Sequence, residues 1–208
     1  MKASGASYNK IGIDLTGFVI RKWWFVGKYI FCYLVNEKRK QHYVIRTHMM
    51  MYGKITINNQ PPINPRLRPF LVLELDDTTI LSWYLTQIKI LDPTCKTDMI
   101  KSNYQYCSSK KTIMDSMELM KYDISHPKFN MEQYRRHLDT GVKRFANDIL
   151  VDFLLNQEYF PGVGNILQQE ALYRCKLNPL KTVNQLAVNQ LLCLVDKLKE
   201  VINQLYQS

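Results

Sequence analysis

The sequence predicts an α+β protein in which an incomplete, antiparallel β-sandwich-like domain precedes a small helical domain. Up to Leu91, the apolar residues are β-branched or aromatic and often alternate with polar ones, which is typical of strands. After Asn130, apolar residues recur at helical spacing. A polar, aperiodic stretch lies between the two patterns. We therefore expect a β-domain at 1–92, a linker or irregular segment at 93–128 and a helical domain at 129–208.

The first domain should contain about six strands in an antiparallel meander or sandwich. Turn-forming residues at 36–40, 58–62 and 76–77 interrupt the pattern. The strand-forming stretches are GFVIRKWWFVGKYIFCYL, HYVIRTHMMMYGKITI and RPFLVLELDDTTILSWYLTQIKIL.

Helix signals mark the second domain. Asn130 and Gln133 are spaced like a capping box ahead of MEQYRRHL, and RFANDILVDFLL has apolar residues at helical spacing. Thr182 and Gln185 have the same spacing, and we expect them to open a long amphipathic helix that runs to the end of the chain.

The formal charge of +10 is spread along the chain, which makes a polyanion the first partner to consider. The most apolar window, 17–35, carries Arg21, Lys22 and Lys28, so it is not expected to span a membrane. Nucleic acid is therefore favoured over a membrane as the partner.

The five cysteines show no C-x-x-C spacing and the four histidines include no closely spaced pair, so neither a metal site nor a cofactor is predicted. The first residues lack the apolar core of a secretory signal, which indicates an intracellular protein in a reducing compartment. We therefore expect no disulfides. Each cysteine should be a small buried residue or an incidental thiol.

The stretch FPGVGNI, at 160–166, lies between two helix-like segments. Gly162 and Gly164 can take positive φ and let a ligand approach the backbone, and Asn165 is a favoured N-cap residue. The free N–H groups of the following helix would form an anion site, and the charge of the chain indicates a nucleic-acid phosphate. A tight interhelical turn with an ordinary cap is the alternative.

The segment LLNQEYFPGVGNILQQEALYRCKLNPL, at 154–180, resembles the helix-two-turns-helix of the formamidopyrimidine/endonuclease VIII family of DNA glycosylases. GKYIF and HMMMYGKI are similar to two β-domain motifs of this family, and TTILSWYLTQIKILDP is most similar to the endonuclease VIII branch, which prefers oxidised pyrimidines. The resemblance implies a base-excision-repair glycosylase with AP lyase activity, base flipping and a Schiff-base intermediate. Its partner would be duplex DNA with damaged bases or abasic sites. Binding of single-stranded DNA stays an open alternative.

The resemblance also implies roles for residues of the β-domain. Lys28 would contact a phosphate near the lesion, and His48 would lie near the DNA backbone; a solvated lysine and a structural histidine are the alternatives. Met50, Met51 and Tyr52 would form the wedge that fills the gap left by a flipped nucleotide. In the alternative, the methionines pack a strand core.

In the helical domain, Gly162, Gly164 and Asn165 match the phosphate clamp of the family. The family glutamate falls on Glu170, which would orient groups at the site or the clamp unless it is a solvated helix residue. Unspecific phosphate contacts are expected from four further basic residues, which are Arg135, Arg136, Lys143 and Arg144.

The sequence departs from the family at both ends. Family members begin with Pro-Glu, whose proline amine attacks C1′, but here the first proline is Pro61 and the first glutamate is Glu37. The resemblance starts near Ile11, so we expect the first helix and opening strands of the family to be missing, together with its zinc finger and arginine finger. A sheet edge would then be exposed, and we expect a monomer unless a partner covers this edge.

Two hypotheses follow from these departures. In the first, the chain is a glycosylase and AP lyase that uses a substitute amine, either the α-amino group of Met1 or Lys28, or that is completed by sequence missing from this reading frame. Lys28 and Glu170 are then the catalytic candidates. Alternatively, the chain is an inactive module that binds damaged DNA. An RNA-associated protein is a third hypothesis, supported only by net charge.

Overall fold

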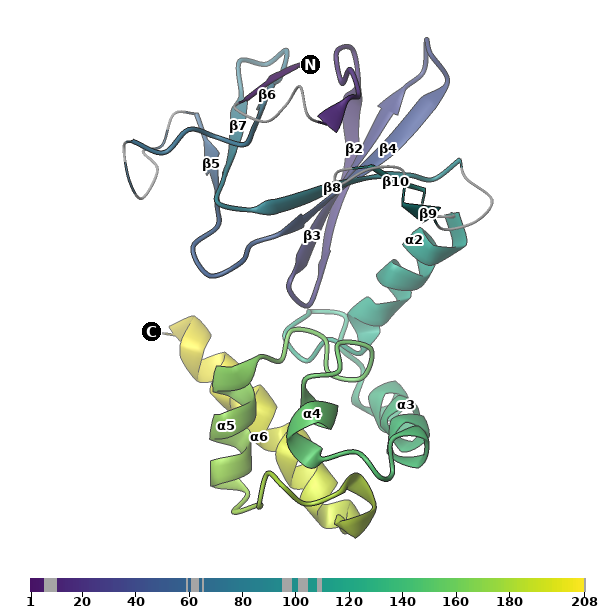
Figure 1. Cartoon of the computed structure of the whole chain (residues 1–208), viewed down its shortest axis with the longest axis vertical. Helices are drawn as coiled ribbons and strands as arrows, with labels where there is room; N and C mark the ends of the chain where they lie inside the picture. The colour runs from purple at the N-terminus through teal and green to yellow at the C-terminus, as the bar shows by residue number, and fades with distance from the viewer. Residues whose placement is uncertain are drawn as a thin grey trace. The chain divides into compact units, whose positions relative to one another are not determined.

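The computed structural model describes residues 1–5, 11–58, 60, 64, 66–94, 99–100, 105–107 and 110–207. The chain forms two compact units, Met1–Asp115 and Ser116–Ser208, and each is described by itself. The regular structure of the first unit is mainly strands and that of the second is helices (Figure 1), so the predicted α+β class is confirmed.

Two β-sheets form the first unit, and their order differs from the chain order. The first sheet, β1-β6-β7-β5, consists of Lys2–Ser4, Leu71–Glu74, Ile80–Tyr84 and Lys54–Ile57. The second sheet, β2-β3-β4-β8-β10-β9, consists of Val19–Val26, Tyr29–Asn36, Gln41–His48, Gln87–Asp92, Gln105–Cys107 and Met99–Ile100. The pairings of the described strands are antiparallel, except that β10 runs parallel to β8.

Alternate residues of both sheets meet in one core, which makes the sheets a sandwich. Trp83 of β7 is fully buried, and its indole Nε1 donates a hydrogen bond to Thr47 Oγ1 of β4 at 3.1 Å. The buried apolar side chains of this core include Cys32, Leu34, Ile45, Leu71, Leu73, Ile88 and Ile90.

A strand ahead of Ile11 lies at the edge of the first sheet, where none was predicted. Lys2 pairs with Glu74 and Ser4 with Val72, so β1 covers the free edge of β6. The α-amino group of Met1 is also 3.0 Å from an Asp76 carboxylate oxygen. Three residues are too few to show strand periodicity, so only tertiary pairing reveals this strand.

The range predicted as a linker, 93–128, holds regular structure. It contains the short strands β9 and β10, the helix α2 (Lys110–Glu118) and a 3₁₀ turn, η1 (Leu119–Lys121). β10 is three residues long and pairs with β8 of the same sheet. Such pairing with a distant strand leaves no local signal in the sequence.

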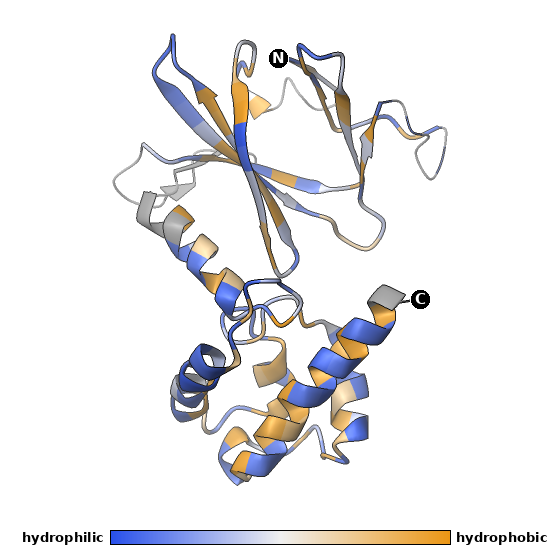
Figure 2. Ribbon diagram, turned by 180° about the vertical axis from the view of Figure 1, so that it is seen from behind, coloured by the Kyte–Doolittle hydropathy of each residue, from blue (hydrophilic) through white to orange (hydrophobic). Residues whose placement is uncertain are grey.

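The second unit contains four α-helices besides η1 and η2 (Val183–Gln185). They are α3 (Met131–Arg144), α4 (Leu150–Leu154), α5 (Asn165–Arg174) and α6 (Val188–Gln207). In Figure 2, orange and blue residues both occur on each turn of α6, as its amphipathic pattern requires. Its buried residues Leu194, Val195, Leu198 and Ile202 join the core of this unit.

The helix boundaries confirm one cap and correct two predictions. The Asn130 side chain accepts from Gln133 N at 2.9 Å, so it caps α3 as predicted. The Thr182–Gln185 capping box opens only the short η2, and the long helix begins at Val188. The helical spacing of RFANDILVDFLL does not form a continuous helix, because α3 ends at Arg144, turns occupy 145–148 and α4 covers only Leu150–Leu154.

A disulfide joins Cys175 to Cys193, which contradicts the expectation of none. Packing of α5 against α6 brings the two Cα atoms within 6.0 Å, although 18 positions separate the residues. Cys32 is a buried free thiol, and burial raises its pKa. Cys95 lies outside the described residues.

Within the described ranges, no helix combines the length and apolarity needed to cross a bilayer.

Candidate functional site

In the first unit, the candidate residues gather where β2 turns into β3 and where β4 ends. Gly27 and Lys28 form the β2–β3 turn, and Gly27 takes a positive φ of 54° that favours glycine. Lys28 remains exposed at its tip, but burial of part of the side chain lowers its pKa. A lysine with a lowered pKa is more often unprotonated at neutral pH.

His48 is the last residue of β4 and lies opposite Tyr29 of β3. The two rings are 5.1 Å apart, and the Arg46 guanidinium lies over the Tyr29 ring at 5.2 Å. Burial, followed by the positive charges of Lys28 and Arg46, lowers the pKa of His48. This part of the sheet therefore carries two cations and a histidine that favours its neutral form.

The residues after His48 leave the strand and form a tight turn. Gly53 N donates to Met49 O at 2.7 Å, and a Cβ at Gly53 would lie only 2.0 Å from that oxygen, so the turn requires glycine. Met50, Met51 and Tyr52 are 58%, 87% and 66% exposed. The alternative in which these methionines pack a strand core is therefore wrong. We call Met50–Tyr52 the exposed loop.

In the second unit, the turn between α4 and α5 is organised by one side chain. Gln157 Nε2 donates to Leu155 O and Val163 O, both at 2.9 Å, and its Oε1 accepts from Gly162 N at 3.2 Å. Gly162 has a positive φ of 87°, as predicted, whereas Gly164 is extended with φ −128°. Gln157 was not singled out from the sequence, because no local pattern marks a side chain that spans a turn.

The start of α5 corrects the predicted cap. Gly164 is the N-cap residue and Asn165 is the first helical residue, with an exposed side chain. The first bond to a helical acceptor runs from Gln168 N to Gly164 O at 2.9 Å, so the N–H groups of residues 165–167 have no acceptor within the helix. A glycine cap adds no side chain over these donors, which suits an anion.

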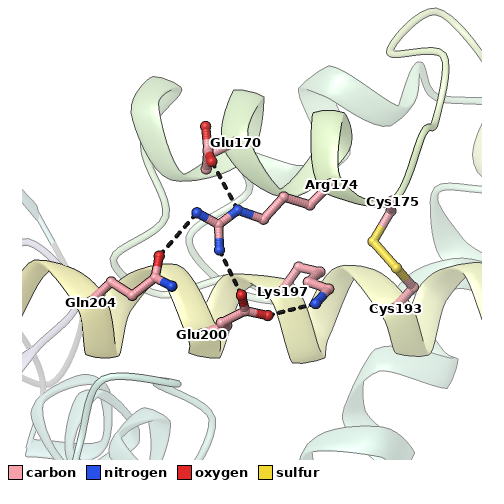
Figure 3. A network of polar contacts seen from close by, with 7 residues as sticks. All are labelled: Glu170, Arg174, Cys175, Cys193, Lys197, Glu200 and Gln204. Carbon is pink, nitrogen blue, oxygen red and sulfur yellow. Dashed lines mark hydrogen bonds and ion pairs between the residues drawn. A yellow bond between two sulfur atoms is a disulfide. The ribbon is translucent and has the colours of Figure 1, made fainter.

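Glu170 lies in the next turn of α5 and takes part in an ion-pair network with α6 (Figure 3). Its Oε1 accepts from Arg174 Nε at 2.8 Å, and Arg174 also donates to Glu200 at 2.8 Å and to Gln204 at 2.9 Å. The role of Glu170 at a catalytic site or phosphate clamp stays a prediction. In the structure, the Glu170 carboxylate contacts Arg174.

The four basic residues of α3 are exposed, and two of them have ion-pair partners. Arg136 pairs with Glu132, and Arg144 lies 3.5 Å from Glu158. The other two basic residues of α3, Arg135 and Lys143, are also exposed.

The structure thus brings the candidates together in two groups, one in each unit. Lys28, His48 and Met50 are neighbours in the first unit. Arg46 belongs to this group but was not predicted, although its position two residues before His48 on a strand places both on one face.

Comparison with known proteins gives consistent matches. Residues 125–206 match the family described as the formamidopyrimidine-DNA glycosylase H2TH domain. Over 205 residues, the chain is 49% identical to the endonuclease 8-like protein L720 of Acanthamoeba polyphaga mimivirus, covering 99% of this chain and 73% of that protein. The mouse endonuclease 8-like 3 is 27% identical over 166 residues, which are 79% of this chain but only 23% of the mouse protein.

Solved structures agree with these matches. The crystal structure of a viral DNA glycosylase has a TM-score of 0.88 and 48% identity, covering all of this chain and 74% of that one. MutM bound to DNA containing carbocyclic 8-oxo-G has a TM-score of 0.64 at 17% identity, covering 98% of this chain and 70% of that chain, and supports the fold alone.

Proposed function

Because the chain belongs to the formamidopyrimidine/endonuclease VIII family of DNA glycosylases, we propose that it is a base-excision-repair glycosylase with AP lyase activity. Its substrates are oxidised bases in duplex DNA, pyrimidines first, and abasic sites. It acts as a monomer at an intracellular location that holds DNA, in the nucleus, the cytoplasm or a viral replication site.

The observation that carries this proposal is the grouping of Lys28, His48 and the exposed loop at one end of the second sheet. Lys28 supplies an amine whose pKa is lowered by burial. The exposed loop supplies large apolar side chains that can fill a gap in stacked DNA, where unstacking costs a few kcal/mol. An amine beside a wedge is the pair of functions that base flipping followed by Schiff-base chemistry needs.

In the proposed reaction, unprotonated Lys28 Nζ attacks C1′ of the flipped nucleotide. The C1′–N bond to the damaged base breaks, and the base leaves with a proton. The C1′–O4′ bond of the resulting aminal then breaks, O4′ takes a proton from water, and a protonated Schiff base joins C1′ to Nζ. This Schiff base makes the C2′ proton acidic, and transfer of that proton to water expels the 3′ phosphate as the C3′–O bond breaks. Water then hydrolyses the Schiff base and frees Lys28.

The second unit holds the DNA backbone in this proposal. The N–H groups of residues 165–167 and the positive end of the α5 dipole bind a phosphate. Exposed Arg135 and Lys143 of α3 add contacts that do not depend on sequence. The formal charge of +10 favours such binding along the duplex.

The test is borohydride trapping on a labelled duplex with one abasic site, followed by peptide mapping. The proposal expects a covalent complex at Lys28 that is lost in Lys28→Arg, which keeps the positive charge. A covalent complex mapped to the Met1 amine would support the lyase activity but would identify Met1, instead of Lys28, as the nucleophile.

A second candidate function is a module that binds damaged DNA without cleaving it. The contact between the α-amino group of Met1 and Asp76 Oδ1, at 3.0 Å, favours this candidate. An amine held by a carboxylate is not free to attack C1′. Absence of trapping by a preparation that binds the same duplex would support this candidate and overturn the lyase proposal.

A further inference from the structure

The exposed loop is tied to His48 by a hydrogen bond that depends on protonation. Met50 N donates to His48 Nδ1 at 3.1 Å, and Met50 Sδ also lies 3.1 Å from Nδ1. An imidazole nitrogen accepts only while it carries no proton, so this bond requires neutral His48 with its proton on Nε2. The strand end and the loop are therefore joined through one titratable group.

The hydrogen bond holds a residue whose backbone conformation is unfavourable. Met50 has a positive φ of 53°, which is unfavourable for a residue with a side chain. A second hydrogen bond, from Gly53 N to Met49 O, closes the turn. Without the His48 acceptor, Met50 would keep a strained backbone with an unpaired amide.

The surroundings of His48 favour its neutral form. Lys28 approaches from the β2–β3 turn, Tyr29 lies opposite on β3, Arg46 shares the face of β4, and neutral Gln87 is its register partner on β8. Burial, then Lys28 and then Arg46, lowers the pKa of His48. Protonation therefore occurs below the ordinary value of about 6.5.

We propose that His48 is a positioning residue whose neutral imidazole holds the exposed loop in place, and that protonation of His48 releases this loop. The acid release follows from the geometry of the loop. Only its consequence, weaker preference for a lesion at low pH, rests on the proposed function.

The first experiment follows the Met50 amide by NMR in protein labelled with ¹⁵N-methionine, with the signal assigned through Met50→Leu. Between about pH 5 and 8, the Met50 signal should titrate with a midpoint below 6.5. His48→Asn offers Oδ1 at the position of Nδ1, so the amide should stay hydrogen-bonded and its titration should be lost. In His48→Ala, the signal should take the released position at every pH.

A matched control is His42→Asn, which removes a histidine of the same strand that contacts Tyr33 instead of the loop. In this variant, the Met50 amide signal should titrate as it does in the natural chain. A Met50 amide that does not titrate in the natural chain, or that titrates equally in His48→Asn, overturns the proposal.

The second experiment measures the ratio of affinities for abasic and intact duplex across the same pH range. This ratio should fall several-fold on acidification in the natural chain and stay constant in His48→Asn. If the amide titrates but the abasic duplex is not preferred at any pH, the proposed function fails and the loop release stands. If preference exists and the amide does not titrate, the release alone is refuted.

Discussion

Cys175, at the C-cap of α5, is bonded to Cys193 of α6, so a covalent link ties the helix that begins at Asn165 to the longest helix of the second unit. The link lies next to the Arg174 network, and both join α5 to α6 (Figure 3). The start of α5, which is the proposed phosphate site, is thereby supported from the opposite end of the helix.

Removal of this disulfide should lower the stability of the second unit. In the chain-entropy account, a disulfide that closes a loop of 18 positions lowers the conformational entropy of the unfolded chain. This stabilises the folded state by about 3 kcal/mol. Cys193→Ser should therefore melt several degrees below the oxidised natural chain in calorimetry. Reductant should lower the melting temperature of the natural chain and leave Cys193→Ser unchanged; equal effects on both would contradict the link.

Gln157→Ala should destabilise the turn that precedes α5. It removes three hydrogen bonds, to Leu155 O, Val163 O and Gly162 N, for an expected loss of about 1–3 kcal/mol in denaturant unfolding. Gln157→Glu is the matched control of equal size. Because a carboxylate cannot donate to the two carbonyls, it should be no more stable than Gln157→Ala, and a fully stable Gln157→Glu would refute this account.

The features that the sequence made predictable are those set by local periodicity. Alternation along β4 places Arg46 and His48 on one face, and the Asn130–Gln133 spacing marks the start of α3. Contacts between distant segments were not predictable. The Cys175–Cys193 bond depends on helix packing, and the exact start of α5 depends on the Gln157 turn, which made Gly164 the cap instead of Asn165.

Two substitutions should separate backbone binding from lesion recognition. Asn165→Ala keeps the backbone N–H but removes the exposed side-chain amide at the start of α5. It should weaken binding to damaged and intact duplex alike by about tenfold, as expected for one lost hydrogen bond to a charged phosphate. Met51→Ala, at the most exposed tip of the loop, should mainly reduce the preference for an abasic site. Fluorescence anisotropy with both duplexes measures this, and the division of roles fails if both variants lose preference equally.

DNA affinity should fall steeply with salt, because the proposed contacts are to phosphates. Lys143→Gln should reduce the slope of log affinity against log salt by about 1, as expected for one lost phosphate contact. Titrations at several salt concentrations measure the slope. An unchanged slope in Lys143→Gln would show that this lysine contacts no phosphate in the complex.

The rate of borohydride trapping should rise with pH and level off below the ordinary lysine value of about 10.4. Burial lowers the pKa of Lys28, so its folded form loses the proton at a lower pH than a solvated lysine, and only the unprotonated amine attacks C1′. Lys28→Arg keeps the charge and should bind DNA without being trapped. A trapping rate that still rises beyond the ordinary lysine value, or trapping that survives in Lys28→Arg, would assign the nucleophile to another amine.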